Sequence, residues 1–190
     1  YQGLSKKLGL GMRFKEISGL AEWKSRASFF PCYFFHPIPK KIIRGKSDPR
    51  LASLAVQSIK LAVVLALGKK VDAIVTPPIH KASLHKAGFH FPGHTEILAG
   101  LSKVKNYDMM LVGGKLRVAL VTRHLALKDV SKCLSRDRVE KTILLTDREL
   151  RRSFGIRRPR IVVCGLNPHA GDGGRLGVED DARALVLAVA

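Results

Sequence analysis

The chain has 190 residues, 46% of them apolar, so it is long enough to bury the core of one ordinary domain. Its formal charge is +19, from 34 Lys and Arg against 15 Asp and Glu, which makes anionic partners worth testing. The basic stretches 6–50 and 123–160 lack the interleaved aromatic residues that stack bases, so we do not expect nucleic acid as a partner. No apolar run reaches the length of a membrane span, and the opening residues lack the pattern of a secretory signal, so we expect no membrane association.

The three cysteines, Cys32, Cys133 and Cys164, are far apart and include no C-x-x-C pair. Their number and spacing indicate neither a disulfide framework nor a zinc ribbon. A reducing compartment fits this cysteine usage, and we therefore expect a cytoplasmic protein.

Residues 1–44 show no clean hydrophobic period, and we interpret them as a divergent N-terminal segment that precedes the main domain, 45–190. That domain opens with a predicted helix. Asp48 is in the N-cap position, Pro49 is the first helical residue, and apolar residues recur at three- and four-residue spacing up to Gly68.

Strands and helices are predicted to alternate through the rest of the domain. Short runs rich in β-branched residues predict strands at 71–76, 116–122 and 160–166. Helical spacing predicts helices at 95–103, at 128–153 with a break near Ser135, and at 178–190, where Glu179, Asp180 and Asp181 would lie at the positive end. This alternation predicts an α/β fold with a largely parallel sheet covered on both faces.

Two of the seven histidines follow predicted strands closely. His124 comes two residues after the strand that ends at Thr122, and His169 comes three residues after Leu166. The carboxyl ends of neighbouring parallel strands share one edge of a sheet, so these imidazoles could together hold a divalent transition metal. The alternative is that each histidine is an ordinary loop residue hydrogen-bonded to backbone.

Two further sites have the chemistry to bind an anion. His94 and Thr95 stand at a predicted helix start, where unpaired N–H groups favour negative charge, although Thr95 could equally be a simple helix cap. Lys81 follows the strand predicted at 71–76 and could meet a phosphate or carboxylate, or be a solvated loop charge.

Four segments together carry a family resemblance: 71–81 (VDAIVTPPIHK), 93–96 (GHTE), 121–127 (VTRHLAL) and 164–174 (CGLNPHAGDGG). In order and spacing they resemble the 4-hydroxythreonine-4-phosphate dehydrogenases and their phospho-threonate relatives. The resemblance covers about residues 45–190, and its most specific part is the Asn-Pro-His-Ala-Gly segment with the strand before it.

The resemblance implies a three-layer α/β/α fold akin to the isocitrate and isopropylmalate dehydrogenases, and a homodimer. It implies NAD- or NADP-dependent oxidation of 4-phosphohydroxy-L-threonine to a β-keto acid, which decarboxylates to 3-amino-2-oxopropyl phosphate in vitamin B6 biosynthesis. A divalent metal (Zn, Mg or Co) held by three histidines would polarise the substrate hydroxyl. Carried over, His124 and His169 are two metal ligands, His94 and Thr95 contact the substrate, and the role of Lys81 stays open.

The third histidine of this family lies in a Tyr-His-Asp-Gln-Gly-like segment that has no match after Gly177. We therefore expect a truncated member of the family with little or no activity of its own. Two alternatives remain open. One is a dehydrogenase of phospho-threonate or phospho-erythronate type, and the other is a non-catalytic basic remnant that binds anions or nucleic acid.

Overall fold

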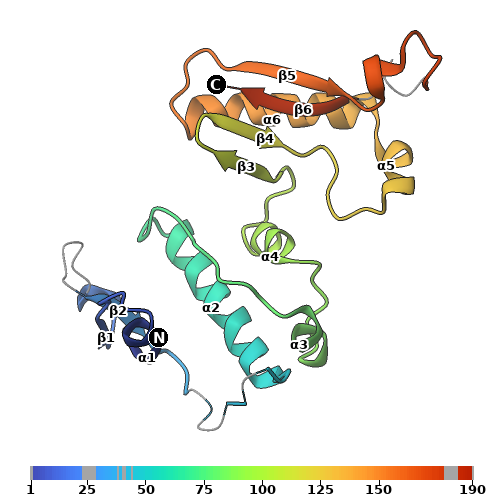
Figure 1. Cartoon of the computed structure of the whole chain (residues 1–190). Helices are drawn as coiled ribbons and strands as arrows, with labels where there is room; N and C mark the ends of the chain where they lie inside the picture. Colours follow the sequence, from blue (N-terminus) through green and yellow to red (C-terminus); the bar gives the residue numbers. More distant parts are fainter. Residues whose placement is uncertain are drawn as a thin grey trace. The chain divides into compact units, whose positions relative to one another are not determined.

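A computed structural model describes residues 2–22, 29–37, 39, 42–43, 45–177 and 184–189. The chain divides into two compact units, residues 1–94 and residues 95–190, coloured blue to green and green to red in Figure 1. Helices and strands are mixed through both units, as the predicted α/β class requires.

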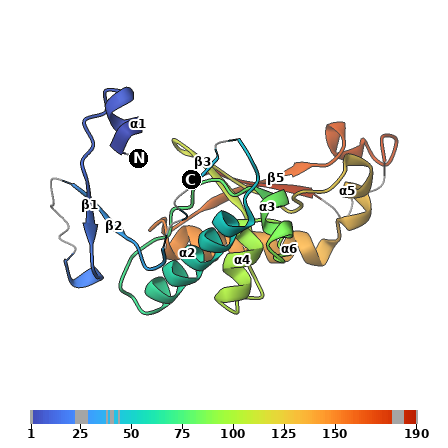
Figure 2. The ribbon, with the colours of Figure 1, turned by 90° about the horizontal axis from the view of Figure 1, so that it is seen from below.

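The first unit begins with a short helix and a two-stranded sheet. Helix α1 spans Gln2–Lys7, strand β1 spans Phe14–Ile17, a single 3-10 turn follows at Leu20–Glu22, and strand β2 spans Phe30–Tyr33. The two strands are parallel neighbours, with Phe14 opposite Phe30, and they run side by side in Figure 2.

Helix α2 (Pro49–Leu67) forms where the sequence predicts it. The Asp48 side chain accepts a hydrogen bond from the backbone N–H of Arg50, and the N–H of Gly68 donates to the last turn. Its buried face includes Ala52 and Val56, which cluster with Leu84 of helix α3 (Lys81–Lys86). This cluster is the hydrophobic core of the first unit.

Helix α2 also corrects one expectation about apolar runs. It is long and apolar enough to cross a membrane by length and composition, contrary to the prediction that no run reaches that length. A single helix of this kind is not specific, because the core helix of a globular domain passes the same test; 22% of the apolar window of α2 is buried, Val56 and Val63 almost completely. The finding is therefore weak evidence for a span.

The strand predicted at 71–76 does not form, and the structure has irregular backbone there. Val75 is 94% exposed, and this β-branched run pairs with no described strand. Strand propensity expresses packing against neighbouring strands, and without that packing the run has no reason to extend into a sheet.

The second unit contains a four-stranded sheet with the order β3-β4-β6-β5. Strands β3 (Met110–Gly113) and β4 (Leu116–Ala119) form a hairpin, and β5 (Arg160–Gly165) pairs along its length with β6 (Ala184–Val189). Every neighbouring pair in this sheet is antiparallel, so the prediction of a largely parallel sheet is wrong for the described strands of this sheet, although β1 and β2 are parallel.

The helix predicted at 178–190 is also wrong where the structure describes it. Residues 184–189 form β6, because an aliphatic run between β4 and β5 can satisfy its backbone groups on both sides. Residues 178–183 and 190, which include Glu179, Asp180 and Asp181, lie outside the described residues.

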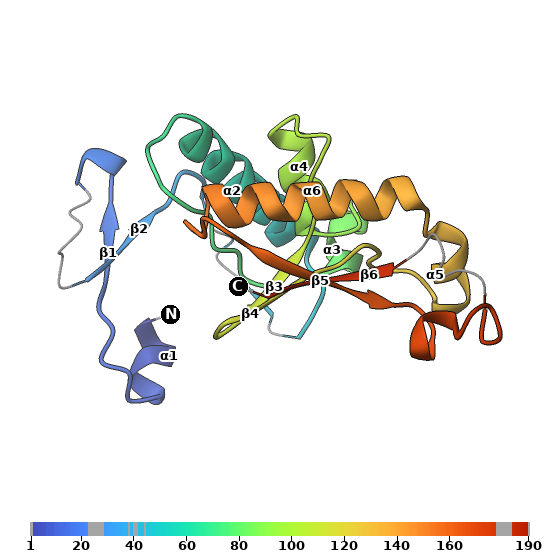
Figure 3. The same ribbon diagram turned by 90° about the horizontal axis from the view of Figure 1, so that it is seen from above.

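The remaining helices follow the predictions closely. Helix α4 spans His94–Leu101, α5 spans Leu127–Cys133 and α6 spans Arg136–Arg152, with the break at Ser135, whose hydroxyl caps α6. Helix α6 lies against one face of the sheet, as Figure 3 shows, and Val139 packs there with Ala119, Val121 and Leu134. This second core holds the loops that follow β4 and β5.

Candidate metal and substrate site

Strand directions bring the two candidate metal ligands to one edge of the sheet. Strands β4 and β5 each pair antiparallel with β6, so they run in the same direction. Leu116 of β4 and Arg160 of β5 are both opposite Val189, so the two strands are also level with each other. His124 follows β4 and His169 follows β5, and the two strands are two spacings apart, about 10 Å. Both loops therefore leave the sheet at the same edge, although β4 ends at Ala119, earlier than predicted.

Unusual backbone conformation is concentrated in these two loops. Six described residues other than glycine have positive φ, and four of them are here: His124 (55°), His169 (52°), Ala170 (49°) and Asp172 (46°). The left-handed region is costly for residues with a Cβ atom, and such residues cluster where the surrounding structure holds a functional group in place. The last three lie in or just after a 3-10 turn, Pro168–Gly171.

The chemistry of the two imidazoles fits a metal. Both side chains are exposed, and neither has a hydrogen bond or an ion pair to another described residue. No group of three or more His, Cys, Asp or Glu side chains that could hold a metal occurs among the described residues. A metal held by two imidazoles would need further ligands to complete its coordination.

His94 and Thr95 are the first two residues of α4, so Thr95 lies inside the first turn rather than before it. The Nε2 atom of His94 is buried and has no hydrogen-bond partner in the described part of the chain. A buried polar atom without a partner is rare in folded proteins and calls for one, and a ligand at the start of this helix would supply it.

His80 and Lys81 have different local roles. His80 caps α3, with its Nδ1 atom 2.8 Å from the hydroxyl of Ser83, and that hydroxyl is 2.9 Å from the hydroxyl of Ser47. Lys81 is exposed at the first position of α3. His80, Ser83, Ser47 and Asp48 line a cavity of about 380 Å³, and Lys81 is not part of its lining.

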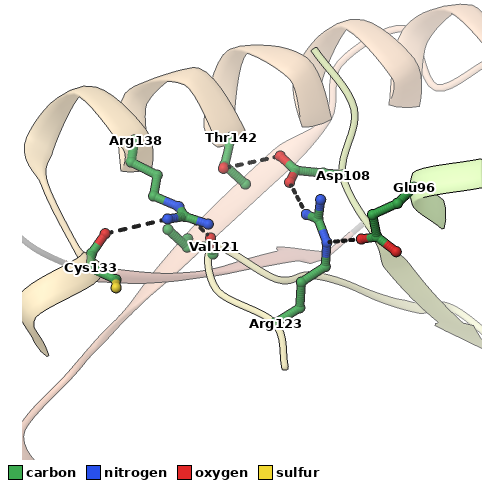
Figure 4. A network of polar contacts seen from close by, with 7 residues as sticks. All are labelled: Glu96, Asp108, Val121, Arg123, Cys133, Arg138 and Thr142. Atoms are coloured by element: carbon green, nitrogen blue, oxygen red, sulfur yellow. Dashed lines mark hydrogen bonds and ion pairs between the residues drawn. The ribbon is translucent and has the colours of Figure 1, made fainter. Parts of the chain in front are cut away.

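A polar network that the sequence analysis missed lies directly behind the His124 loop (Figure 4). The guanidinium of Arg123 donates to Asp108 at 3.1 Å and lies 3.7 Å from a carboxylate oxygen of Glu96. The other oxygen of Asp108 accepts a hydrogen bond from the hydroxyl of Thr142 on α6, at 3.1 Å. Arg123 and Glu96 stand inside the motifs that contain His124 and His94, but only the fold reveals that they meet.

A second arginine fixes the start of the same loop. Nε of Arg138, on α6, donates to the backbone carbonyl of Val121 at 2.9 Å, and a second nitrogen approaches the carbonyl of Cys133 (Figure 4). Arg123, Asp108 and Arg138 also line a cavity of about 680 Å³ on this side of α6. The backbone before His124 is therefore held from two directions.

The amino-acid sequence matches the family model described as pyridoxal phosphate biosynthetic protein PdxA over residues 7–187. It is 38% identical to a 4-hydroxythreonine-4-phosphate dehydrogenase of Stutzerimonas stutzeri over 178 residues, which cover 93% of this chain and 54% of that protein. It is 49% identical to the protein of the same name from Ruegeria sp. over 138 residues, 72% of this chain and 42% of that protein. The chain spans about half the length of the curated relatives it matches.

Solved structures agree with the sequence comparison. A 4-hydroxythreonine-4-phosphate dehydrogenase from Klebsiella pneumoniae superposes with a TM-score of 0.81 at 36% identity, covering 95% of this chain and 57% of that one. The structure of the same enzyme from Burkholderia phymatum gives a TM-score of 0.78 at 37% identity, covering 94% and 54%. These neighbours confirm the predicted α/β class and the family's fold, and the relatives' names confirm a dehydrogenase family. The chain belongs to the pyridoxal phosphate biosynthetic protein PdxA family.

Proposed function

We propose that this chain supplies part of a metal-dependent active site that oxidises 4-phosphohydroxy-L-threonine with NAD or NADP. One observation carries the proposal: His124 and His169 follow two strands of the same direction at one edge of the sheet, and both have strained, left-handed backbone. The names of the curated relatives indicate the class of substrate, a phosphorylated hydroxy amino acid.

In this proposal His124 and His169 hold a divalent ion with their neutral imidazoles. Imidazole donors suit zinc or cobalt better than magnesium, which prefers carboxylate and water oxygens. A bound ion would act as a Lewis acid on the substrate's secondary hydroxyl and so favour hydride loss to the nicotinamide. The β-keto acid product would then decarboxylate to 3-amino-2-oxopropyl phosphate.

The substrate's anionic groups would meet His94 and Thr95 at the start of α4. Backbone N–H groups in the first turn of a helix lack partners within the helix and carry partial positive charge, so they attract an anion. The buried Nε2 of His94 supports this role because it has no hydrogen-bond partner among the described residues. His94 would donate to, or accept from, an oxygen of the substrate, and Thr95 would add a hydroxyl.

The full reaction requires more than these residues. The chain covers about half of each relative, and two histidines hold a metal more weakly than a complete set of ligands. We therefore propose that the chain alone turns over negligibly and that the complete site is cytoplasmic and homodimeric, as in the family it resembles.

Zinc binding and turnover test the proposal together. Isothermal titration of the chain should show zinc binding that weakens at least about tenfold in His124→Ala and in His169→Ala, because each variant removes one ligand. His36→Ala, which changes a histidine of the first unit, is the matched control and should bind as the native chain does.

Turnover should be at background with NAD or NADP, whether the substrate is 4-phosphohydroxy-L-threonine, phospho-threonate or phospho-erythronate. Equal zinc affinity in all four proteins would remove the proposed site. Efficient turnover by the isolated chain would overturn the claim that the site needs further residues.

A further inference from the structure

The side chain of Arg123 joins three segments of the second unit. It is only 16% exposed, its guanidinium contacts the carboxylates of Asp108 and Glu96, and it lies over the ring of Tyr107 at 4.9 Å from the ring centre. Those carboxylates are 21% and 22% exposed, so water screens this ion-pair network less than it screens the surface pairs of α6. A planar guanidinium is suited to this geometry because it presents several donors in fixed directions.

Both partners of Arg123 are themselves attached to fixed elements. Asp108 accepts a hydrogen bond from Thr142, which is 3% exposed in the core-facing side of α6. Glu96 belongs to the first turn of α4, next to Thr95. Arg123 therefore ties the segment after β4 to α6 on one side and to the start of α4 on the other (Figure 4).

The residue directly after Arg123 is His124, whose backbone is left-handed at φ 55°. A strained conformation persists only where neighbouring contacts hold it. The described contacts immediately before His124 are those of Arg123 and the Arg138 hydrogen bond to the carbonyl of Val121. Arg123 is the nearer of the two in sequence and the one that reaches α4.

We propose that Arg123 is a positioning residue, which fixes the left-handed backbone of His124 and its spacing from the Thr95 end of α4. Arg123 itself touches neither metal nor substrate in this account, since both nearby carboxylates occupy its guanidinium. The expected effect of Arg123 on metal binding rests on the proposed function. The restraint of the His124 backbone by Arg123 does not depend on a metal.

Hydrogen exchange of the metal-free chain, followed by mass spectrometry, tests the structural core. Arg123→Gln should speed exchange at least about fivefold in peptides covering 120–127 and in those covering the first turn of α4, because both lose their common tie. Glu96→Gln should speed exchange mainly in α4. Arg151→Gln is the matched control, since Arg151 forms an exposed pair with Asp147 on α6, and it should leave both regions unchanged.

Zinc affinity of the same proteins tests the consequence. Arg123→Gln should weaken zinc binding about tenfold, because residues that orient metal ligands are typically worth that much. Arg123→Lys should restore less than half of the zinc affinity, in log Kd, that Arg123→Gln loses. A single ammonium group does not contact both carboxylates as the guanidinium does. Arg151→Gln should stay within about twofold of the native chain.

The outcomes separate the two claims. Unchanged exchange at 120–127 in Arg123→Gln overturns the positioning role whatever the metal does. Zinc affinity that depends on His124 but is the same in Arg123→Gln also overturns it, and leaves the proposed function standing. Zinc affinity that is insensitive to His124→Ala removes the proposed function, while faster exchange in Arg123→Gln would still support the structural tie.

Discussion

Several residues of the loop after β5 have backbone φ angles that are unusual for residues other than glycine. His169, Ala170 and Asp172 have φ between 46° and 52°, in a loop that also contains several glycines of positive φ. Residues with a Cβ atom cost about 1–2 kcal/mol each in this region relative to the right-handed conformation. The loop after β5 therefore stores strain close to a candidate metal ligand.

Replacing Ala170 with glycine should relieve part of that strain. Ala170 is exposed, so its methyl group loses little packing, and Ala170→Gly should raise the free energy of unfolding by about 1 kcal/mol. Urea denaturation measures the change. Ala55→Gly inside α2 is the control and should lower stability by about 1 kcal/mol, because glycine is unfavourable within a helix. A loss of stability in both variants would show that the loop is not strained at Ala170.

The sequence shows which residues are candidates for the site, but not the contacts that hold them in place. Histidines after strands and the Gly-His-Thr segment stand out by chemistry and by resemblance, so the sequence singles out His94, Thr95, His124 and His169 as candidates. The partnership of Arg123 with Glu96 and Asp108 could not be predicted, because residues far apart in sequence meet only after the strands and helices are assembled. Positive φ at His124 was not predicted either, since most histidines have negative φ and nothing in the local sequence marks this one.

Helix boundaries are the elements that local chemistry predicts best. Asp48 caps α2 as predicted, and Ser135, where only a break was predicted, caps α6, because an N-cap needs only a side-chain oxygen and the N–H groups two or three residues ahead. The predictions for segments 71–76 and 184–189 were wrong because the conformation of these segments is not decided by local chemistry. Whether an aliphatic run becomes coil, strand or helix depends on which strand edges are available to it.

Removing the cap of α6 should destabilise the second unit. The hydroxyl of Ser135 accepts a hydrogen bond from the N–H of Arg138 at 3.3 Å, and Ser135→Ala should cost about 1 kcal/mol of unfolding free energy. Ser135→Asp retains a capping oxygen and should cost little or nothing. Thermal unfolding followed by circular dichroism compares the two, and equal losses in both variants would contradict the capping role.

The free energy of unfolding at acid pH should depend on the ionisation of Asp48. A side-chain hydrogen bond from Arg50 is the main reason that the pKa of Asp48 lies below its ordinary value of 3.8. A carboxyl with a lowered folded-state pKa stabilises the fold above its unfolded pKa, and this stabilisation is lost as the pH falls through the folded value. The effect should therefore appear below about pH 4.

Asp48→Asn isolates that ionisation, because asparagine caps helices about as well as aspartate. The native chain should lose stability more steeply than Asp48→Asn between about pH 5 and pH 2, with a modest difference since the Arg50 partner is exposed. Melting temperatures across this range give the comparison. Parallel acid profiles for the two proteins would show that the Asp48–Arg50 pair is not linked to folding.

The sheet of the second unit has half-exposed apolar side chains on the face opposite α6. Met110, Ala119 and Ile161 pack toward α6, so their neighbours of opposite parity face the other side of the sheet. Three of those neighbours are about half exposed: Leu111 at 56%, Leu116 at 49% and Val162 at 54%. The chain spans about half the length of the relatives it matches.

The proposed metal site requires His124 and His169 to share one ion, and X-ray absorption spectroscopy of the zinc-loaded or cobalt-loaded chain tests this most directly. The extended fine structure counts imidazole ligands, and the account predicts two in the native chain and one in His124→Ala or His169→Ala, with water or buffer oxygens filling the remaining positions. A native spectrum without imidazole scattering, or one that either substitution leaves unchanged, would contradict the shared site.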